Sequence, residues 1–330
     1  MAGAGRGVSR LLVAAQGGDE HAFVELTSPH RRALHLHAYR ILGNLHDADD
    51  AVQETLLRAW RGLPRYEPRA ALAAWLHRIA TNVALRMLEQ RKPAEPLDAH
   101  LQPYPDRLID ELPTPEEQAI AREQVGLAYI AAMQLLPARQ RAVLALREGL
   151  GWSARDTAEA LSLTTPAVNS ALQRARERLA REPEALARVH DSSAGAAVVG
   201  AFLSAWADVD VPRIVALLSD DVLLTMPPLG LRFEGAAAVG EFFATQPMEG
   251  RLDRIAHTVT RAGGQPALAS YADGEAYGVM VFALRGDRIA GITGFPHDLE
   301  LFRQLGLPAR LGTAGGTPKG RRGLAAPPDA

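Results

Sequence analysis

The sequence contains no cysteine and few aromatic residues, which make up 5% of the chain. The absence of cysteine excludes a disulfide framework and makes a zinc site unexpected. No run of about eighteen apolar residues occurs, so we expect no transmembrane helix and no membrane association. Arg6 and Arg10 are not followed by an apolar core and a cleavage site, so we expect no secretory signal. These absences predict a cytoplasmic protein.

The sequence also lacks an excess of charge of either sign. Its 36 Lys and Arg residues against 38 Asp and Glu residues give a formal net charge of −2. Any contact with DNA must therefore come from local basic patches rather than from the charge of the whole protein. At 330 residues, the chain is long enough for two or three domains.

Residues 153–181 have the pattern of a helix-turn-helix that ends in a run of arginines. Ser153, with Asp156 three residues later, predicts one helix start, and Thr165 followed by Pro166 predicts a second. The second helix has an apolar face made of Val168, Ala171, Leu172, Ala175 and Leu179. Its polar side chains are of the types that recognition helices present to bases and phosphates. This segment alone fits an ordinary amphipathic hairpin as well as it fits DNA binding.

Residues 19–92 show helical periodicity. The segment 46–50 places acids in the first turn of a helix, as the helix dipole prefers. An apolar stripe then follows at Ala48, Ala51, Val52, Thr55, Leu56 and Ala59. A loop with two prolines precedes a further helix, which we expect to pack Leu72, Trp75, Leu76, Ile79, Val83 and Met87 inward. The residues expected on the other faces of this helix are His77, Arg78, Asn82, Arg86 and Gln90.

The remaining segments differ in composition. Six prolines within residues 93–115 predict a linker with little regular structure. Residues 116–181 form a second all-helical module. Beyond Pro183 we expect helices over 197–218 and 237–243 and strands over 222–226, 277–284 and 288–293, which is the order of an α+β domain with an antiparallel sheet. We expect residues 1–18 to be flexible and residues 309–330 to be disordered.

Four motifs in order resemble the extracytoplasmic-function group of bacterial RNA polymerase sigma factors. The stretch Asp47–Trp60 resembles region 2.2, and Trp75–Asn82 resembles the helix that follows it. The stretch Leu136–Arg147 and the helix-turn-helix resemble region 4. The resemblance covers roughly residues 19–181. It implies region 2 over 19–92, the linker over 93–115 and region 4 over 116–181.

The resemblance implies core RNA polymerase and promoter DNA as partners. Region 2.2 would dock on the clamp helices of the β′ subunit through Asp47, Asp50, Gln53 and Glu54, and region 4 would meet the β flap. The residues implied for the −10 element are Tyr66, Asn82 and Arg86. Those implied for the −35 element are Thr165, Asn169, Ser170, Gln173, Arg174 and Arg176. Many family members carry an acid at position 86 and basic residues at positions 169 and 171, so the promoter preference is expected to differ.

Residues 195–308 resemble the SnoaL-like domain, a cone-shaped α+β barrel. The resemblance rests on Ala201–Trp206, Met226–Pro228, Gly264–Ala267 and Gly306–Pro308. A subgroup of these sigma factors carries such a domain at the C-terminus, where its implied role is to regulate activity. Residues 101–106 resemble the linker motif of this subgroup, which implies docking against the C-terminal domain. The expected fold is therefore multidomain, with two all-α domains followed by an α+β cone-shaped barrel.

The candidate catalytic and metal-binding residues of the sequence favour neither an enzyme nor a metal site. Enzymes occur in the SnoaL superfamily, but the residues suited to proton transfer form no recognisable motif: Asp221, His257, Tyr271, Asp273 and His297. We therefore expect no enzyme and no catalytic residue, while a small-molecule ligand of this domain stays open. The histidines at positions 30, 35, 37 and 46 lack the spacing of a metal site, so we expect no metal and no cofactor.

The alternative function is a stand-alone helix-turn-helix regulator with a ligand-sensing C-terminal domain, or less favourably an isomerase-like or cyclase-like one. Such a protein would need only the helix-turn-helix. It would leave residues 46–92 without a role, so a sigma factor is the favoured hypothesis.

Overall fold

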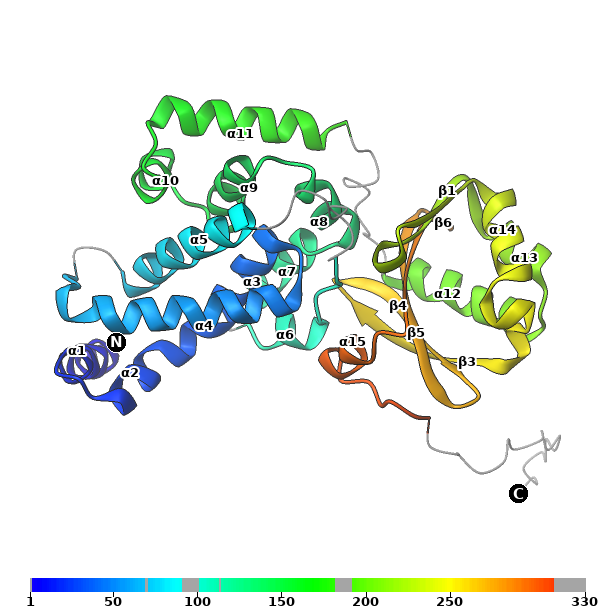
Figure 1. Cartoon of the computed structure of the whole chain (residues 1–330), viewed down its shortest axis with the longest axis horizontal. Coiled ribbons are helices and arrows are strands. Elements are labelled where there is room, and N and C mark those ends of the chain that lie inside the picture. Colours follow the sequence, from blue (N-terminus) through cyan, green and yellow to red (C-terminus); the bar gives the residue numbers. More distant parts are fainter. Residues whose placement is uncertain (1, 69–70, 91–100, 113, 182–191, 312–330) are drawn as a thin grey trace, which may run out of the picture.

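The computed structural model describes residues 2–68, 71–90, 101–112, 114–181 and 192–311 (Figure 1). Two helical parts lie side by side at one end of the molecule, and an α+β part lies at the other. The first helical part contains α1 (Ala2–Gln16), α2 (Glu20–Thr27), α3 (Arg31–Leu42), α4 (Leu45–Gly62) and α5 (Leu72–Gln90).

Helix α1 differs from the flexible N-terminus that we expected over residues 1–18. Leu11 and Leu12 pack against the apolar cluster that contains Phe23. The Gln16 side chain donates hydrogen bonds to the carbonyl oxygens of Leu63 and Tyr66, at 3.1 Å and 2.9 Å. These partners lie 47 and 50 residues away along the chain, so the composition of the segment alone could not indicate them.

Helix α4 confirms the predicted apolar stripe. It begins after Asn44, whose side chain accepts a hydrogen bond from the Asp47 amide at 2.9 Å. All six stripe residues are buried: Ala48, Ala51, Val52, Thr55, Leu56 and Ala59. On α5 the expectation is wrong at His77, which is buried rather than on an outer face. Because α5 packs against both α3 and α4, it buries two of its faces.

The second helical part contains α7 (Pro115–Gln124), α8 (Leu127–Gln134), α9 (Ala138–Leu144), α10 (Ala154–Leu161) and α11 (Thr165–Leu179). Ser153 caps α10 as predicted, since its hydroxyl accepts a hydrogen bond from the Asp156 amide. Thr164 caps α11, one residue before the predicted Thr165. The apolar face of α11 is buried at every predicted position. The predicted helix-turn-helix is therefore present.

The segment expected to have little regular structure is packed where the structure describes it. It contains the short helix α6 (Asp106–Asp110) and buries Leu101, Tyr104, Leu108, Ile109 and Leu112. Residues 93–100 and 113 of the expected linker lie outside the described residues, as do residues 312–330 of the tail expected to be disordered. The expectation is wrong for residues 309–311, because the Ala309 carbonyl accepts from the Ala276 amide and the Leu311 amide donates to the Gly274 carbonyl, both at 2.9 Å.

The C-terminal part begins with α12 (Ser192–Ala207) and α13 (Val211–Ala216), where we expected one helix over 197–218. The two are separate because Val209 has a left-handed backbone, with φ of 54°. Helix α14 (Ala236–Thr245) follows, and α15 (Leu299–Gln304) closes the domain. The six strands are β1 (Leu218–Met226), β2 (Leu231–Glu234), β3 (Ile255–Ala262), β4 (Gln265–Ala272), β5 (Glu275–Arg285) and β6 (Arg288–Pro296).

These strands form one sheet in the order β2-β1-β6-β5-β4-β3. The expectation of a purely antiparallel sheet is wrong for one pair, because β1 lies parallel to β6. One face of the sheet packs on α12 and α14, around Phe202, Trp206, Phe243 and Phe282. The other face carries Tyr271 and Phe295, which pack with Phe302 of α15.

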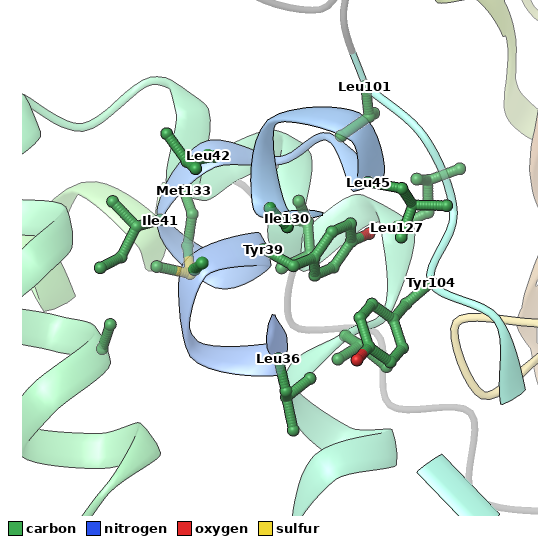
Figure 2. Close-up of a cluster of buried hydrophobic side chains, with 14 of the residues drawn as sticks. Leu36, Tyr39, Ile41, Leu42, Leu45, Leu101, Tyr104, Leu127, Ile130 and Met133 are labelled. Carbon is green, nitrogen blue, oxygen red and sulfur yellow. The ribbon is translucent and has the colours of Figure 1, made fainter. Parts of the chain in front are cut away.

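One apolar core joins all parts of the molecule. It contains Tyr39 from α3, Tyr104 from the linker, Ile130 from α8 and Phe302 from α15. Figure 2 shows the central portion, where the linker side chains of Leu101 and Tyr104 lie beside α3 and α8. The linker is therefore an internal part of the structure that all three parts contact.

Candidate functional site

The outer face of α4 is acidic. Asp50 and Gln53 are exposed, and Asp47 and Glu54 are half-buried. Glu54 accepts a hydrogen bond from Arg58 at 2.7 Å, and the Asp50 carboxylate lies 3.6 Å from His46 Nε2. The four predicted polymerase-contacting residues therefore lie along one helix whose apolar side is buried in the domain.

Helix α15 of the C-terminal part lies close to the beginning of this acidic helix. The pKa of Glu300 is lowered chiefly by its hydrogen-bonded ion pair with Arg303 and, to a smaller extent, by the charge of His46. The pKa of Arg303 is raised by Glu300 first and also by the charge of Asp49. Charges on α15 thus interact with charges in the first turns of α4.

The three residues predicted for the −10 element are divided between two hollows. The Tyr66 ring is buried against Trp75, with ring centroids 4.8 Å apart, and lines a hollow with Trp75 and Trp152. Asn82 and Arg86 are exposed and line a second hollow together with Arg139. The sequence did not indicate that the Tyr66 ring is covered.

Both hollows are shared between the two helical parts. Trp152 and Glu159 come from the helix-turn-helix side, and Arg78 of α5 forms an ion pair with Glu159 at 3.2 Å. The buried Arg141 of α9 donates hydrogen bonds to the carbonyl oxygen of Ile41 and to Gln134. The first helix of the helix-turn-helix therefore lies over the surface that carries Tyr66 and Trp75.

The polar face of α11 is exposed at all six residues predicted for the −35 element: Thr165, Asn169, Ser170, Gln173, Arg174 and Arg176. Three of them donate hydrogen bonds within the protein. Arg174 donates to Ser170 at 2.6 Å, Gln173 to Glu177 at 2.9 Å and Arg176 to Glu148 at 2.7 Å. Contacts between such exposed side chains contribute little to the stability of the fold.

Gln102 of the linker joins the first helical part to the C-terminal part. Its backbone amide donates to the Gly43 carbonyl at 3.2 Å, and its side-chain oxygen accepts from the Leu45 amide at 3.2 Å. Its side-chain nitrogen lies 3.4 Å from the Asp298 carboxylate, which also caps α15. One amide side chain thus connects the start of α4 with the start of α15.

Tyr104 is one of the most deeply buried residues of the linker. Its ring is fully buried, with its centroid 4.8 Å from that of Tyr39, and its hydroxyl is 2.9 Å from His35 Nδ1. Burial raises the pKa of Tyr104, so the phenol stays protonated. Burial also lowers the pKa of His35. The contact is therefore between neutral groups.

Asp106 and the turn between β3 and β4 complete the linker contacts. The Tyr104 carbonyl accepts from the Gly263 amide at 2.6 Å, and Asp106 accepts from the Gly264 amide at 2.7 Å and from Arg261 at 3.0 Å. Beside this turn, the Gln265 side chain accepts from the Leu127 amide of α8 at 2.6 Å. We call residues 101–106 together with the turn at 262–265 the linker clamp.

Comparison with known proteins agrees with this architecture. The chain matches Sigma-70 region 2 over residues 26–93 and Sigma-70 region 4 over residues 126–179. It is 37% identical over 316 residues to the ECF RNA polymerase sigma factor SigG of Mycobacterium tuberculosis, covering 86% of this chain and 84% of that protein. The chain belongs to the extracytoplasmic-function sigma factors.

Two further proteins are similar to different shares of this sigma factor. SigM of Mycobacterium tuberculosis is 36% identical over 178 residues, which cover 53% of this chain and 84% of SigM. The crystal structure of the Mycobacterium tuberculosis extracytoplasmic function sigma factor SigJ has a TM-score of 0.62 and 22% identity, and covers 87% of this chain and 100% of that chain. The predicted order of two helical domains followed by an α+β domain is confirmed. As a sigma factor, the protein directs RNA polymerase to promoters.

The residues considered for proton transfer in the sigma factor do not converge on one cavity. Asp221 and Asp273 are exposed and form ion pairs with Arg285 and Arg254. Tyr271 is buried on the opposite face of the sheet, against Phe302. His297 is exposed, whereas His257 is 3.0 Å from the Ser270 hydroxyl. Among the described residues, no group of three or more His, Asp or Glu could hold a metal ion, and no helix is long and apolar enough to cross a membrane.

The resemblance of residues 101–106 to a linker motif implied docking against the C-terminal domain, and Tyr104 and Asp106 make such contacts with the turn at 262–265. Sequence reasoning did not indicate the individual partners of Gln102, Asp106 and Gln265. The partners of Gln102 are distant along the chain, since Leu45 is 57 positions away and Asp298 is 196 positions away. Such long-range partners leave no local pattern.

Proposed function

We propose that this sigma factor docks on the β′ clamp helices of core RNA polymerase through the acidic face of α4 and meets the β flap through region 4. Support comes from Asp50 and Gln53, which are exposed on a helix whose other side is packed into the core. Asp47 and Glu54 extend the same face. A rigid, packed helix that presents a narrow polar face is suited to binding another protein.

We propose further that α11 reads the −35 element in the major groove and that α5, with the neighbouring Tyr66 loop, contacts the −10 element. The exposed polar face of α11 supports the first assignment. Trp75, Arg78, Asn82 and Arg86 give α5 the mixture of aromatic and cationic groups that suits single-stranded DNA. The sigma factor itself would catalyse no reaction, since the polymerase performs nucleotidyl transfer. We expect the sigma factor to act in the cytoplasm.

The C-terminal domain is proposed to hold regions 2 and 4 in a closed arrangement through the linker clamp. In this arrangement α10 lies over Tyr66 and Trp75, and the Arg78–Glu159 ion pair joins the two surfaces. The single observation that carries the proposal is the continuous core through Tyr104, because it couples the linker to all three domains. Opening would free both DNA-binding surfaces.

The test begins with purified full-length protein, bacterial core polymerase and a library of promoters. We expect stable association with core polymerase and run-off transcripts that start at a defined set of promoters. Binding to duplex DNA without association with polymerase would contradict the assignment and favour the stand-alone regulator.

Removal of residues 195–330 is a poor test of the closed arrangement because it uncovers Tyr104 and Leu127, so point variants of the linker clamp are preferable.

A further inference from the structure

The C-terminal domain contains a cavity of about 220 Å³ between its sheet and its helices. Its walls come from Trp206 of α12, Phe242 and Phe243 of α14, and the strands β5 and β6. Exposed Leu231, Gln246 and His297 border it on the solvent side. A dry cavity of about 150 Å³ is enough to bind benzene. This cavity therefore has room for a molecule somewhat larger than one aromatic ring.

The wall of the cavity carries very little polarity. The lining residues include no Asp, Glu, Lys or Arg, and its one deeply placed hydroxyl belongs to Ser270, which is 3% exposed. The indole nitrogen of Trp206 is already engaged, since it donates to the Leu252 carbonyl at 3.1 Å. Ser270 is thus the inner polar group that a bound molecule would meet.

The partner of Ser270 determines which hydrogen-bonding role remains for its hydroxyl. The Ser270 oxygen lies 3.0 Å from His257 Nδ1, and the His257 ring packs edge-on against Trp206. His257 Nε2 is buried and has no hydrogen-bond partner. A buried N–H without an acceptor is the rarer and more costly state. The hydrogen therefore belongs on Nδ1, where it is donated to the Ser270 oxygen.

This tautomer leaves the Ser270 hydroxyl hydrogen free to be donated. Burial also lowers the pKa of His257 to about 4, so the pair is uncharged near neutral pH. An apolar wall with a neutral inner donor penalises a charged ligand, because the charge would lose its hydration without gaining a counter-charge. It accommodates a neutral molecule with one acceptor oxygen.

We propose that this cavity is a ligand site for a small, neutral, mainly apolar molecule of about the size of a bicyclic aromatic, whose carbonyl or ether oxygen accepts a hydrogen bond from Ser270. The site follows from the shape and polarity of the cavity alone. It therefore stands or fails separately from the proposed role of the domain in closing the sigma factor.

The test uses three related probes with the full-length protein: 1-indanone, indane and indane-1-carboxylate. Isothermal titration calorimetry should show 1-indanone binding about three- to tenfold more tightly than indane, since one net hydrogen bond separates them. The carboxylate should bind at least about tenfold more weakly than the ketone. Ser270→Ala should remove the advantage of the ketone and leave the affinity for indane unchanged.

Matched variants separate the cavity from adventitious binding. Leu231→Trp should obstruct the solvent side and weaken both neutral probes, whereas Val259→Trp, at an exposed position that does not line the cavity, should not. Ser204→Ala removes a surface hydroxyl in the same domain and should leave all affinities unchanged. If Ser270→Ala does not fold, the proposal is tested by the order of affinities of the three probes and by the two tryptophan variants.

Three results would overturn the proposal. The first is the absence of 1-indanone binding up to its solubility limit. The second is equal affinity for the ketone and the carboxylate. The third is binding that is insensitive to Leu231→Trp.

Discussion

Two buried histidines make region 2 sensitive to protonation. The His37 and His77 rings lie 5.3 Å apart, centroid to centroid. His37 Nε2 is 2.8 Å from the Thr81 hydroxyl, and His77 Nδ1 is 2.7 Å from the Ala73 carbonyl, to which it donates. Burial is the main cause that lowers the pKa of each residue. Both side chains are therefore neutral in the folded state near neutral pH.

The stability of the protein should fall as the pH decreases below about 6.5, the usual pKa of histidine. In that range the unfolded chain takes up protons at His37 and His77, and also at His35 and His257, that the folded protein does not bind, so protonation favours unfolding. The free energy of unfolding, measured by urea denaturation between pH 7.5 and 5.5, should decrease with decreasing pH. The loss continues until the pH falls through the lowered pKa values of the folded state.

Substitution at these positions separates this effect from general acid sensitivity. His77→Gln should reduce the dependence on pH by the share of one histidine, even if it lowers stability overall, whereas His21→Gln at an exposed position should not. A wild-type stability that is constant from pH 7.5 to 5.5 would contradict the assignment of neutral, buried histidines.

The acidic face of α4 provides a second prediction for individual residues. The double variant Asp50→Ala/Gln53→Ala should weaken binding to core polymerase about tenfold or more, because hydrogen bonds to charged groups contribute about 1.5–3 kcal/mol each. Both residues are exposed, so the free energy of unfolding should change by only about 0.5 kcal/mol. Competition for labelled core polymerase measures the affinity. Glu25→Ala, an exposed acid on α2, serves as the control, and equal affinity of both variants would contradict the docking proposal.

The residues that sequence reasoning placed correctly are those fixed by a single helix. The stripe from Ala48 to Ala59 and the exposed face of α11 follow from helical spacing alone. His77 and Tyr66 were placed wrongly or incompletely because their surroundings come from other elements. His37 of α3 covers His77, and Trp75 of α5 covers the Tyr66 ring.

Among the elements, the turn between β3 and β4 is the one on which the linker clamp depends. Gly263 has φ of +62°, and a Cβ atom at this position would lie 2.8 Å from the backbone carbonyl oxygen of Val125. The next residue, Gly264, also has a positive φ and approaches Arg122 closely. The turn thus needs glycine both for its conformation and for its contact with region 4.

Gly263→Ala should loosen the linker clamp. Gly286→Ala is a matched control, because Gly286 also has φ of +62° in a strand turn but a Cβ atom there would meet nothing within 4 Å. Both variants should lose about 1 kcal/mol through backbone strain. Only Gly263→Ala should increase proteolysis of the linker and alter run-off transcription. Equal behaviour of the two variants would contradict a role for this turn in holding the domains together.

Strands β3 and β4 were not predicted, for a physical reason. Strand β4 is buried over most of its length but contains Ala267 and Ala269, which have low β propensity. Strand β3 lies at the edge of the sheet and is largely exposed, so it has no continuous apolar run. The parallel pairing of β1 with β6 joins residues that are far apart in the chain, such as Leu224 and Ile292. Local sequence patterns do not specify such a pairing.

At the scale of the whole molecule, the linker determines how the domains are arranged. Its prolines predicted little regular structure, whereas the described part contains α6. The resemblance of residues 101–106 implied docking against the C-terminal domain, but not that Leu101 and Tyr104 are buried among all three domains. Their burial depends on α3, on α8 and on the sheet at the same time. The order of the domains could therefore be predicted from the sequence, whereas their closed arrangement could not.

The absence of cysteine allows the closed arrangement to be tested directly. Cysteines introduced at exposed Glu25 in region 2 and Ala180 after α11 would be the only thiol labelling sites in the chain. Energy transfer between dyes at these sites reports whether regions 2 and 4 are together. We predict high transfer in the free protein and low transfer in the complex with core polymerase and promoter. Unchanged transfer in a complex that initiates transcription would contradict the proposal that the sigma factor is closed when free and opens on the polymerase.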